Sequence, residues 1–373
     1  MTLLRIIEGT NIEALALGSI FLGSGGGGNA LLLRPFLEER LLKHKLKVPI
    51  ISFHQLPDDF LVAAVGFLGS PELLEENPPD GDEGLRALHR LEQALGRKVD
   101  ALFSLEGGGV NNVYPLLVSL KTGLPLLDAD GMGRSFPKLQ MTTCHIFGQM
   151  GTPFALVNYE GNDELFTDED NFKLELNTRK ALMKYGGVGF FSGFAMNGRA
   201  AKESLISGTL SFALRLGEVL QKGSYEEMKE ELLQVTRNSL YGEAIELFIG
   251  CVEELGQFEG LKLRSISLKG SKAYEAQQFN VLLQYENVFA YRNNKLVAMV
   301  PDLIIFLEYA TGRPLNNNEI QPDMEIAVIG VPCPTILRTR RALSVVGPQS
   351  FEYNMEYQSL EQLHASYYFG EGS

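Results

Sequence analysis

The chain has 373 residues, of which 45% are hydrophobic and 21% charged, a balance typical of a globular protein with a sizeable core. This length predicts two domains, and the composition excludes disordered, collagen-like and coiled-coil chains. The 33 Lys and Arg residues are outnumbered by 46 Asp and Glu, giving a formal charge of -13, which argues against general binding to nucleic acid or to an anionic membrane surface.

The cysteine pattern and the N-terminus indicate a reducing compartment. Cys144, Cys251 and Cys333 are odd in number and widely spaced, so they do not form a disulfide framework. The chain begins without the basic and apolar segments of a secretory signal, and no apolar stretch reaches the roughly 18–20 residues of a membrane span. We therefore expect a cytoplasmic protein.

The first third of the chain alternates helix and strand patterns. Helices are expected over residues 13–21, 30–45, 84–95 and 113–121, and strands over residues 48–53, 61–68, 99–105 and 124–127. The order strand, loop, helix, strand is typical of a βαβ unit with parallel strands. We expect residues 1–165 to form an α/β domain around a largely parallel or mixed sheet.

The pattern changes after the polar, acid-rich stretch 158–170, which we interpret as the domain boundary. A strand is expected over residues 187–194 and helices over 198–221 and 225–233. Further strands are expected over residues 261–268, 279–285, 288–291, 296–300 and 325–331. Residues 166–373 are therefore predicted to form an α+β domain that is rich in β-structure and mostly antiparallel.

The glycine run Gly25, Gly26, Gly27 and Gly28 lies between two predicted helices. It lacks the spacing and the preceding strand of a dinucleotide-binding fingerprint, and the chain has no phosphate-binding Gly-Lys-Ser or Gly-Lys-Thr. Four adjacent glycines lose much backbone entropy on folding. The run is either a flexible turn or a loop whose amides meet an anionic or carbonyl group at the start of the next helix.

A second glycine cluster, Glu106-Gly107-Gly108-Gly109-Val110-Asn111-Asn112, directly follows a predicted strand. Such a turn presents N–H groups at the positive end of a helix, and Asn111 or Asn112 could donate to a carbonyl oxygen. The alternative is tight packing of strand on helix. Ligands of parallel sheets bind beyond the carboxyl ends of strands, so Gly107, Gly108, Gly109 and Asn111 are candidate substrate-binding residues.

Asp128 and Asp130 follow the next predicted strand and share one side if the chain is still extended there. Two close carboxylates bind a cation, or one of them has a raised pKa and acts as acid or base. The alternative is an Asp-Gly turn with solvated carboxylates. Arg134 could pair with either Asp or hold a substrate carboxylate. We expect this turn and the Gly107–Gly109 turn to face one cleft at the same edge of the sheet.

Among the five histidines, His145 is the best candidate for a site, with His54 as a rival at another strand end. His145, Cys144 and the two acids upstream could supply N, S and O ligands for zinc. The alternative is a hydrogen-bonded structural histidine. The chain lacks His-Glu-x-x-His, Cys-x-x-Cys and Gly-x-Ser-x-Gly, so no common metalloprotease or serine-hydrolase motif is present.

The order of these motifs resembles a known family. The glycine run 25–28, the block from Asp128 to Met141, the segment Val300-Pro301-Asp302-Leu303-Ile304 and the segment Val346-Gly347-Pro348 are similar to the family called domain of unknown function 917. Its better-studied members are S-methyl thiohydantoin desulfurases, often found with hydantoinase and oxoprolinase genes. The resemblance covers nearly the whole chain and implies a two-domain α/β protein with a β-rich second domain.

The resemblance also implies a function. It predicts a hydrolase that acts on a hydantoin-like five-membered ring, releases a thiol and leaves a hydantoin, with zinc as the expected cofactor. Zinc lowers the pKa of bound water, glycine amides stabilise developing charge, and an Asp moves the proton. The candidate catalytic and metal residues are Asp128, Asp130 and His145, and the candidate substrate-binding residues are Gly25–Gly28, Gly107–Gly109, Asn111 and Arg134.

A second hypothesis comes from a different class of protein. The chain could be a non-catalytic small-molecule binding protein or a subunit that partners a hydantoinase- or oxoprolinase-type enzyme, with its glycine loops holding a ligand without chemistry. A homo-oligomer is expected in either case. Bound metal and thiol release distinguish the two hypotheses.

Overall fold

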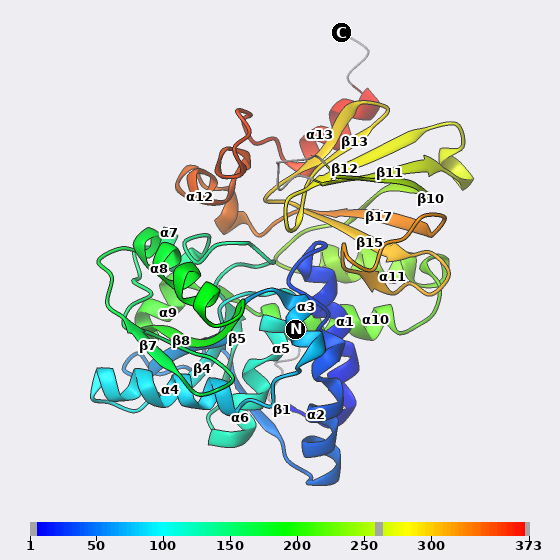
Figure 1. Cartoon of the computed structure of the whole chain (residues 1–373). Helices are drawn as coiled ribbons and strands as arrows, with labels where there is room; N and C mark the ends of the chain where they lie inside the picture. The colour runs from blue at the N-terminus through cyan, green and yellow to red at the C-terminus, as the bar shows by residue number, and fades with distance from the viewer. Residues whose placement is uncertain (1–5, 258–263, 370–373) are drawn as a thin grey trace.

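The computed structural model describes residues 6–257 and 264–369, which form two sheets with helices around them (Figure 1). The first sheet has the strand order β1-β2-β5-β4-β3-β8-β6-β7, and β9 pairs with β5. Neighbours β2/β5, β5/β4 and β4/β3 are parallel and the other pairs are antiparallel, so the sheet is mixed. Its strands are β1 (Ile6–Ile7), β2 (Val48–Ile51), β3 (Leu61–Gly69), β4 (Ala101–Ser104), β5 (Leu126–Asp130), β6 (Phe154–Val157), β7 (Asp163–Phe166), β8 (Val188–Asn197) and β9 (Ile206–Ser207).

Helix α1 of the first half is buried on nearly every side. Helix α1 reads Ile-Glu-Ala-Leu-Ala-Leu-Gly-Ser-Ile-Phe-Leu-Gly, and it packs lengthwise on α10. Gly18 and Gly217 permit this approach, because a Cβ on either would meet a backbone carbonyl of the other helix. The helices of this half are α1 (Ile12–Gly23), α2 (Arg34–Glu38), α3 (Pro71–Glu76), α4 (Asp82–Leu95), α5 (Gly109–Val113), α6 (Pro115–Thr122), α7 (Thr143–Ile146), α8 (Asn171–Lys184), α9 (Gly198–Ser204), α10 (Thr209–Leu220) and α11 (Tyr225–Arg237).

The second sheet is antiparallel throughout, with the order β14-β13-β12-β11-β10-β17-β15-β16. Helix α1 contacts β15 and β16 of this sheet as well as α10 and α5 of the first half, while α13 packs on β14 (Figure 1). This confirms the expected β-rich second half. Its elements are β10 (Ile245–Gln257), β11 (Arg264–Gly270), β12 (Gln278–Leu283), β13 (Asn287–Arg292), β14 (Lys295–Met299), β15 (Leu303–Glu308), β16 (Pro314–Leu315), β17 (Glu325–Val331), α12 (Arg340–Val346) and α13 (Leu360–Phe369).

The helix expected over residues 198–221 is wrong in one respect that matters for function. The chain forms α9, leaves the helix at Leu205, pairs β9 with Ala129 and Asp130 of β5, and begins again as α10. Gly208, with φ of 81°, makes the turn into α10. Pairing with the end of β5 therefore outweighs the helical pattern, and it brings the start of α10 to the two aspartates.

Other expected boundaries shift more simply. The helix expected over residues 30–45 is a 3-10 turn, Ala30–Leu33, followed by α2 and a π-helical turn, Glu39–Lys43, with Pro35 in the first turn of α2. Of the strand expected over 261–268, residues 261–263 lie outside the described part, and β11 begins at Arg264. The first sheet also takes in β8 and β9, so it draws strands from both sides of residue 165. In the described residues no helix is long and apolar enough to cross a membrane.

Candidate functional site

The turns that follow β4 and β5 meet at one edge of the first sheet. The two strands are parallel neighbours, with Ser104 opposite Asp130. The amide of Gly131 donates to the carbonyl of Leu105 over 3.2 Å. A Cβ on Gly107 would come within 2.5 Å of Asp130 Oδ2. The expectation that both turns lie at the same edge is therefore confirmed.

The first glycine run packs directly on the second glycine cluster. The amide of Val110 donates to the carbonyl of Gly27 over 2.8 Å. A Cβ on Gly27, whose φ is 73°, would lie 2.3 Å from Ser135 Oγ and 3.0 Å from the Cα of Gly109. The missing side chains thus allow two backbones to touch, with the Ser135 hydroxyl beside both.

Residues from the second half of the chain pack on the first glycine run. Glu286 ends the turn from β12 to β13 and Asn287 begins β13, and the amide of Asn287 donates to the carbonyl of Ser24 over 2.9 Å. A Cβ on Gly26 would lie 2.8 Å from Glu286 Oε1. We call this meeting place the domain seam, and define it by Gly25–Gly28, Glu106–Gly109, Asp130, Ser135 and Glu286–Asn287.

Three buried carboxyl groups in the domain seam have raised pKa values. Burial raises the pKa of Glu106 to about 8, opposed by the Ser135 and Asn111 side chains and reinforced by the charges of Glu286 and Asp130. Burial raises the pKa of Asp130 to about 6, opposed mainly by backbone amides. Burial likewise raises the pKa of Glu286 to about 7, opposed by Arg134. At neutral pH the three groups therefore differ in proton occupancy.

The domain seam also gathers buried polar atoms that have no hydrogen-bond partner. By strict geometry they are Asp130 Oδ2, Ser135 Oγ, Glu286 Oε2 and Asn287 Oδ1, although Ser135 lies close enough to Glu106, and Thr209 close enough to Asp130, to lower the pKa of the carboxyl group. None of these four residues is more than 4% exposed. Buried polar groups are nearly always paired, so such a group of unpaired atoms needs a physical reason. These unpaired atoms make the domain seam the candidate ligand site of the described residues.

The two aspartates of β5 have different surroundings. Both oxygens of Asp128 accept from Ser211, one from its amide over 2.9 Å and one from its hydroxyl. Asp128 therefore fastens the first turn of α10 to the sheet. Asp130 Oδ1 accepts from the amides of Met132 and Gly133 over 2.6 Å each, while Oδ2 has no partner. Of the pair, Asp130 is the one with a free oxygen.

Arg134 connects the two halves of the chain through backbone carbonyls. It is fully buried, and its guanidinium donates to the carbonyls of Pro301, Asp302 and Asn287 over 3.1, 2.8 and 3.3 Å. Burial lowers its pKa to about 10. Its hydrogen bonds go to backbone carbonyls and to neither Asp128 nor Asp130, so the expected pairing with an aspartate is not formed, and a role in holding a substrate carboxylate stays a prediction.

Asn111 orients Glu106. Its Oδ1 accepts from the amide of Phe67 over 2.8 Å, and its Nδ2 donates to the carbonyl of Phe67 and to Glu106 Oε2 over 3.1 and 2.9 Å. The side chain expected to reach a ligand carbonyl instead holds a carboxyl group at the end of β4. Asn112 donates to Ser19 Oγ on α1 over 2.9 Å.

His145 and Cys144 are adjacent on α7 but have different neighbours. His145 is half-buried, its Nδ1 lies 3.2 Å from Asn171 Nδ2, and its ring meets the ring of Phe172 edge-on at 5.2 Å. Burial and then the charge of Arg341 lower its pKa. Cys144 faces the end of β5, where burial and the charge of Asp130 raise the pKa of its thiol. The ring of His145 therefore contacts the start of α8 and not the aspartates.

The residues expected to hold zinc do not fit a metal ion in this arrangement. Over residues 6–257 and 264–369, no group of three or more His, Cys, Asp or Glu side chains could hold a metal. Asp128 is taken up by Ser211, and His145 faces Asn171. That the protein binds zinc stays a prediction from the family resemblance.

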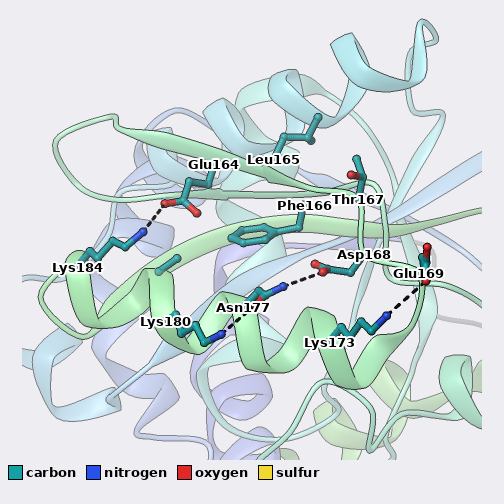
Figure 2. A pocket seen from close by; sticks show the side chains of 11 residues that line it. Glu164, Leu165, Phe166, Thr167, Asp168, Glu169, Lys173, Asn177, Lys180 and Lys184 are labelled. Carbon is teal, nitrogen blue, oxygen red and sulfur yellow. Dashed lines mark hydrogen bonds and ion pairs between the residues drawn. The ribbon is translucent and has the colours of Figure 1, made fainter.

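Two hollows on the surface lie outside the domain seam. Figure 2 shows one of about 530 Å³ between β7 and α8, where Lys173 and Lys184 pair with Glu169 and Glu164. This hollow shares no residue with the domain seam. The other, of about 1020 Å³, includes Asn29 and Glu319, which lie beside the end of the glycine run. Neither is lined by Glu106, Asp130 or Glu286.

Sequence reasoning missed part of the domain seam. In the sequence, Glu106 stands out only as the start of a glycine cluster, although an acid that follows a strand and precedes three glycines is itself a signal of a site. Ser135 lay within the block that carried the family resemblance, but nothing singled it out. Glu286 and Asn287 gave no signal, because they are about 150 residues away from Ser135 along the chain.

Comparison with known proteins identifies the family. Sequence models of the S-Me-THD-like N-terminal and C-terminal domains match residues 10–168 and 169–360. The chain therefore belongs to the S-Me-THD-like family, as its motifs indicated. No curated protein matches it. A crystal structure of a protein from Chromobacterium violaceum has the same fold, with 24% identity, a TM-score of 0.81, and coverage of 96% of this chain and all of the other.

Proposed function

We propose that the protein hydrolyses the exocyclic C–S bond of an S-methyl thiohydantoin-like ring, releasing methanethiol and leaving a hydantoin. Membership of the S-Me-THD-like family supports this class of substrate. The observation that carries the chemistry is the pair Glu106 and Asp130, buried at neighbouring strand ends with pKa values near 8 and 6. Two carboxyl groups whose pKa values lie on either side of neutrality suit the roles of acid and base.

Asp130 is the proposed base. At neutral pH its carboxylate is mostly ionised, and Oδ2 lies beside Gly107, with the Thr209 side chain and the Gly107 amide favouring the ionised form. As the oxygen of water bonds to the ring carbon that bears sulfur, Oδ2 takes one proton from that water, and the π electrons of the ring C=N bond move onto nitrogen. Ser135 Oγ, which lies against both glycine loops, is placed to donate to the developing charge on the ring.

Glu106 is the proposed acid. Its carboxyl group is mostly protonated at neutral pH, and Asn111 fixes its orientation. When the C–S bond breaks, its electrons stay with sulfur, and Glu106 supplies the proton that makes methanethiol. The new hydroxyl group becomes the ring carbonyl and returns a proton to Glu106, while the proton on Asp130 passes to the ring nitrogen. One water is consumed and both carboxyl groups regain their starting state.

Substrate entry requires the domain seam to open. Glu106 is 8% exposed and Asp130 is fully buried, and Glu286–Asn287 from the second half of the chain closes over the glycine loops. We propose that the ring enters when this turn or the Gly25–Gly28 run moves away, and that closure then excludes bulk water from the reacting atoms.

The test is the release of free thiol from S-methyl thiohydantoin by the purified protein, compared with Glu106→Gln. Release by the wild type and a loss of at least about 100-fold in the variant would support the proposal. Binding of the ring without thiol release would favour the binding-protein hypothesis. A Glu106→Gln variant with wild-type turnover would overturn the acid role.

A further inference from the structure

The turn Glu286–Asn287 presents two hydrogen-bond acceptors that the proposed reaction does not use. Glu286 Oε2 and Asn287 Oδ1 are buried and have no partner. Both lie against the first glycine run, since a Cβ on Gly26 would touch Glu286 and a Cβ on Gly25 would lie 2.7 Å from Asn287 Nδ2. They therefore border the space where the ring is proposed to bind.

The orientation of this turn is fixed by four hydrogen bonds of Asn287 and its neighbours. Asn287 Nδ2 donates to the carbonyl of Ile304 over 2.8 Å, so the other end of the amide, Oδ1, is the acceptor without a partner. The backbone of Asn287 donates to Ser24 and accepts from Arg134. Asn317 Nδ2 holds the preceding carbonyl, that of Tyr285, over 3.2 Å.

The unpaired atoms follow one another around the domain seam. Glu286 lies against Gly26, Ser135 against Gly27 and Gly108, and Asp130 against Gly107. Gly26 and Gly27 are consecutive in one loop, as Gly107 and Gly108 are in the other, so these groups follow one another along the two glycine loops. Three of the four unpaired atoms are carboxylate or amide oxygens, which accept hydrogen bonds. Asp130 Oδ2 is used by the proposed reaction, which leaves Glu286 in its ionised form and the amide oxygen of Asn287 as acceptors that a ligand N–H would pair with.

We propose that the Glu286–Asn287 turn selects rings with an unsubstituted N–H and rejects N-alkylated rings. This inference rests on the proposed function for the kind of ring, and it deepens that function by adding a requirement on the ring nitrogens. An N-methyl group would leave buried acceptors without a partner, which lowers affinity by roughly tenfold or more for each hydrogen bond that is lost. The turn is thus a specificity element supplied by the second half of the chain.

The binding test uses product rings, so that it does not depend on turnover. Calorimetry compares hydantoin with 1,3-dimethylhydantoin on the wild type, on Glu286→Gln and on the surface control Glu275→Gln. We expect hydantoin to bind wild type and control at least about tenfold more tightly than the dimethyl ring, and this ratio to fall several-fold in Glu286→Gln. Equal ratios in all three proteins, or no binding of either ring, would overturn the inference.

A turnover arm separates this inference from the proposed function. The rate of thiol release is measured for S-methyl thiohydantoin and its N-methyl analogue with the same three proteins, whose melting temperatures are compared to establish folding. Release of thiol from both substrates at equal kcat/KM would support the proposed hydrolysis and overturn the proposed preference for rings with an unsubstituted N–H. If neither substrate releases thiol but hydantoin still binds more tightly than the dimethyl ring, the proposed hydrolysis is overturned and the preference for N–H is supported.

Discussion

Gly107 and Asp130 lie so close that a Cβ on the glycine would come within 2.5 Å of Asp130 Oδ2. That oxygen is buried and has no partner, while Oδ1 is held by two amides. The end of β5 thus offers one free carboxylate oxygen to a space bordered by glycine backbone. The chemistry we propose depends on this relationship and on the neighbouring Glu106.

The pH dependence of thiol release should be bell-shaped. The proposed reaction needs Asp130 ionised and Glu106 protonated, so the rate should rise as pH passes about 6 and fall as pH passes about 8. The residual activity of Glu106→Gln should lose the fall at high pH, because the titrating group is gone. A descending limb that persists in the variant would assign that limb to another group.

Gly27→Ala should destabilise the protein more than Gly161→Ala. Both glycines have positive φ, but a Cβ at position 161 meets nothing within 4 Å, whereas one at position 27 would lie 2.3 Å from Ser135 Oγ. We expect a loss of about 2–5 kcal/mol in the free energy of unfolding for Gly27→Ala, from backbone strain and overpacking together. Urea unfolding measures both variants. Equal losses would mean that the glycine run yields to a side chain.

Arg134→Met should weaken the connection between the two halves of the chain. The substitution removes a buried donor and leaves the carbonyls of Pro301, Asp302 and Asn287 without it. We expect a loss of about 3–5 kcal/mol in urea unfolding, against a negligible loss for the surface control Arg199→Met. If the two variants unfold alike, the carbonyl contacts of Arg134 contribute little to stability.

His145→Ala distinguishes the domain seam from the site expected around His145. Because the ring contacts Asn171 and Phe172, we expect turnover close to wild type and a modest fall in melting temperature. Zinc content of the purified wild type and variant is measured on the same samples. Loss of both zinc and turnover at an unchanged melting temperature would restore His145 as a metal ligand.

Local patterns predicted much of the fold. The apolar run of β3 and the strand–glycine–helix order at β4 and α5 predicted parallel strands with a glycine turn at their carboxyl ends, and the structure has this arrangement. The break between α9 and α10 was not predictable in the same way, because Ile206–Ser207 leaves the helix to pair with β5. That pairing depends on a strand about 80 residues earlier, which a helical pattern does not report.

The candidate site was predictable only in part, for a similar reason. Asp130 and the glycines stood out, because acids and glycines at strand ends are informative within a short window. Their roles depend on burial and on hydrogen-bond partners. Ser211 donates to both oxygens of Asp128, while Asp130 Oδ2 has no donor in good hydrogen-bond geometry. Glu286 reaches the same place from the second half of the chain, and only the folded structure brings it there.

The most direct test of the central claim is thiol release from S-methyl thiohydantoin by wild type, Glu106→Gln and the exposed control Glu76→Gln at pH 7. The account predicts stoichiometric methanethiol and hydantoin from wild type and control, and a rate at least about 100-fold lower in Glu106→Gln with unchanged melting temperature. Equal rates of release from all three proteins, or release from none while the ring still binds, would contradict it.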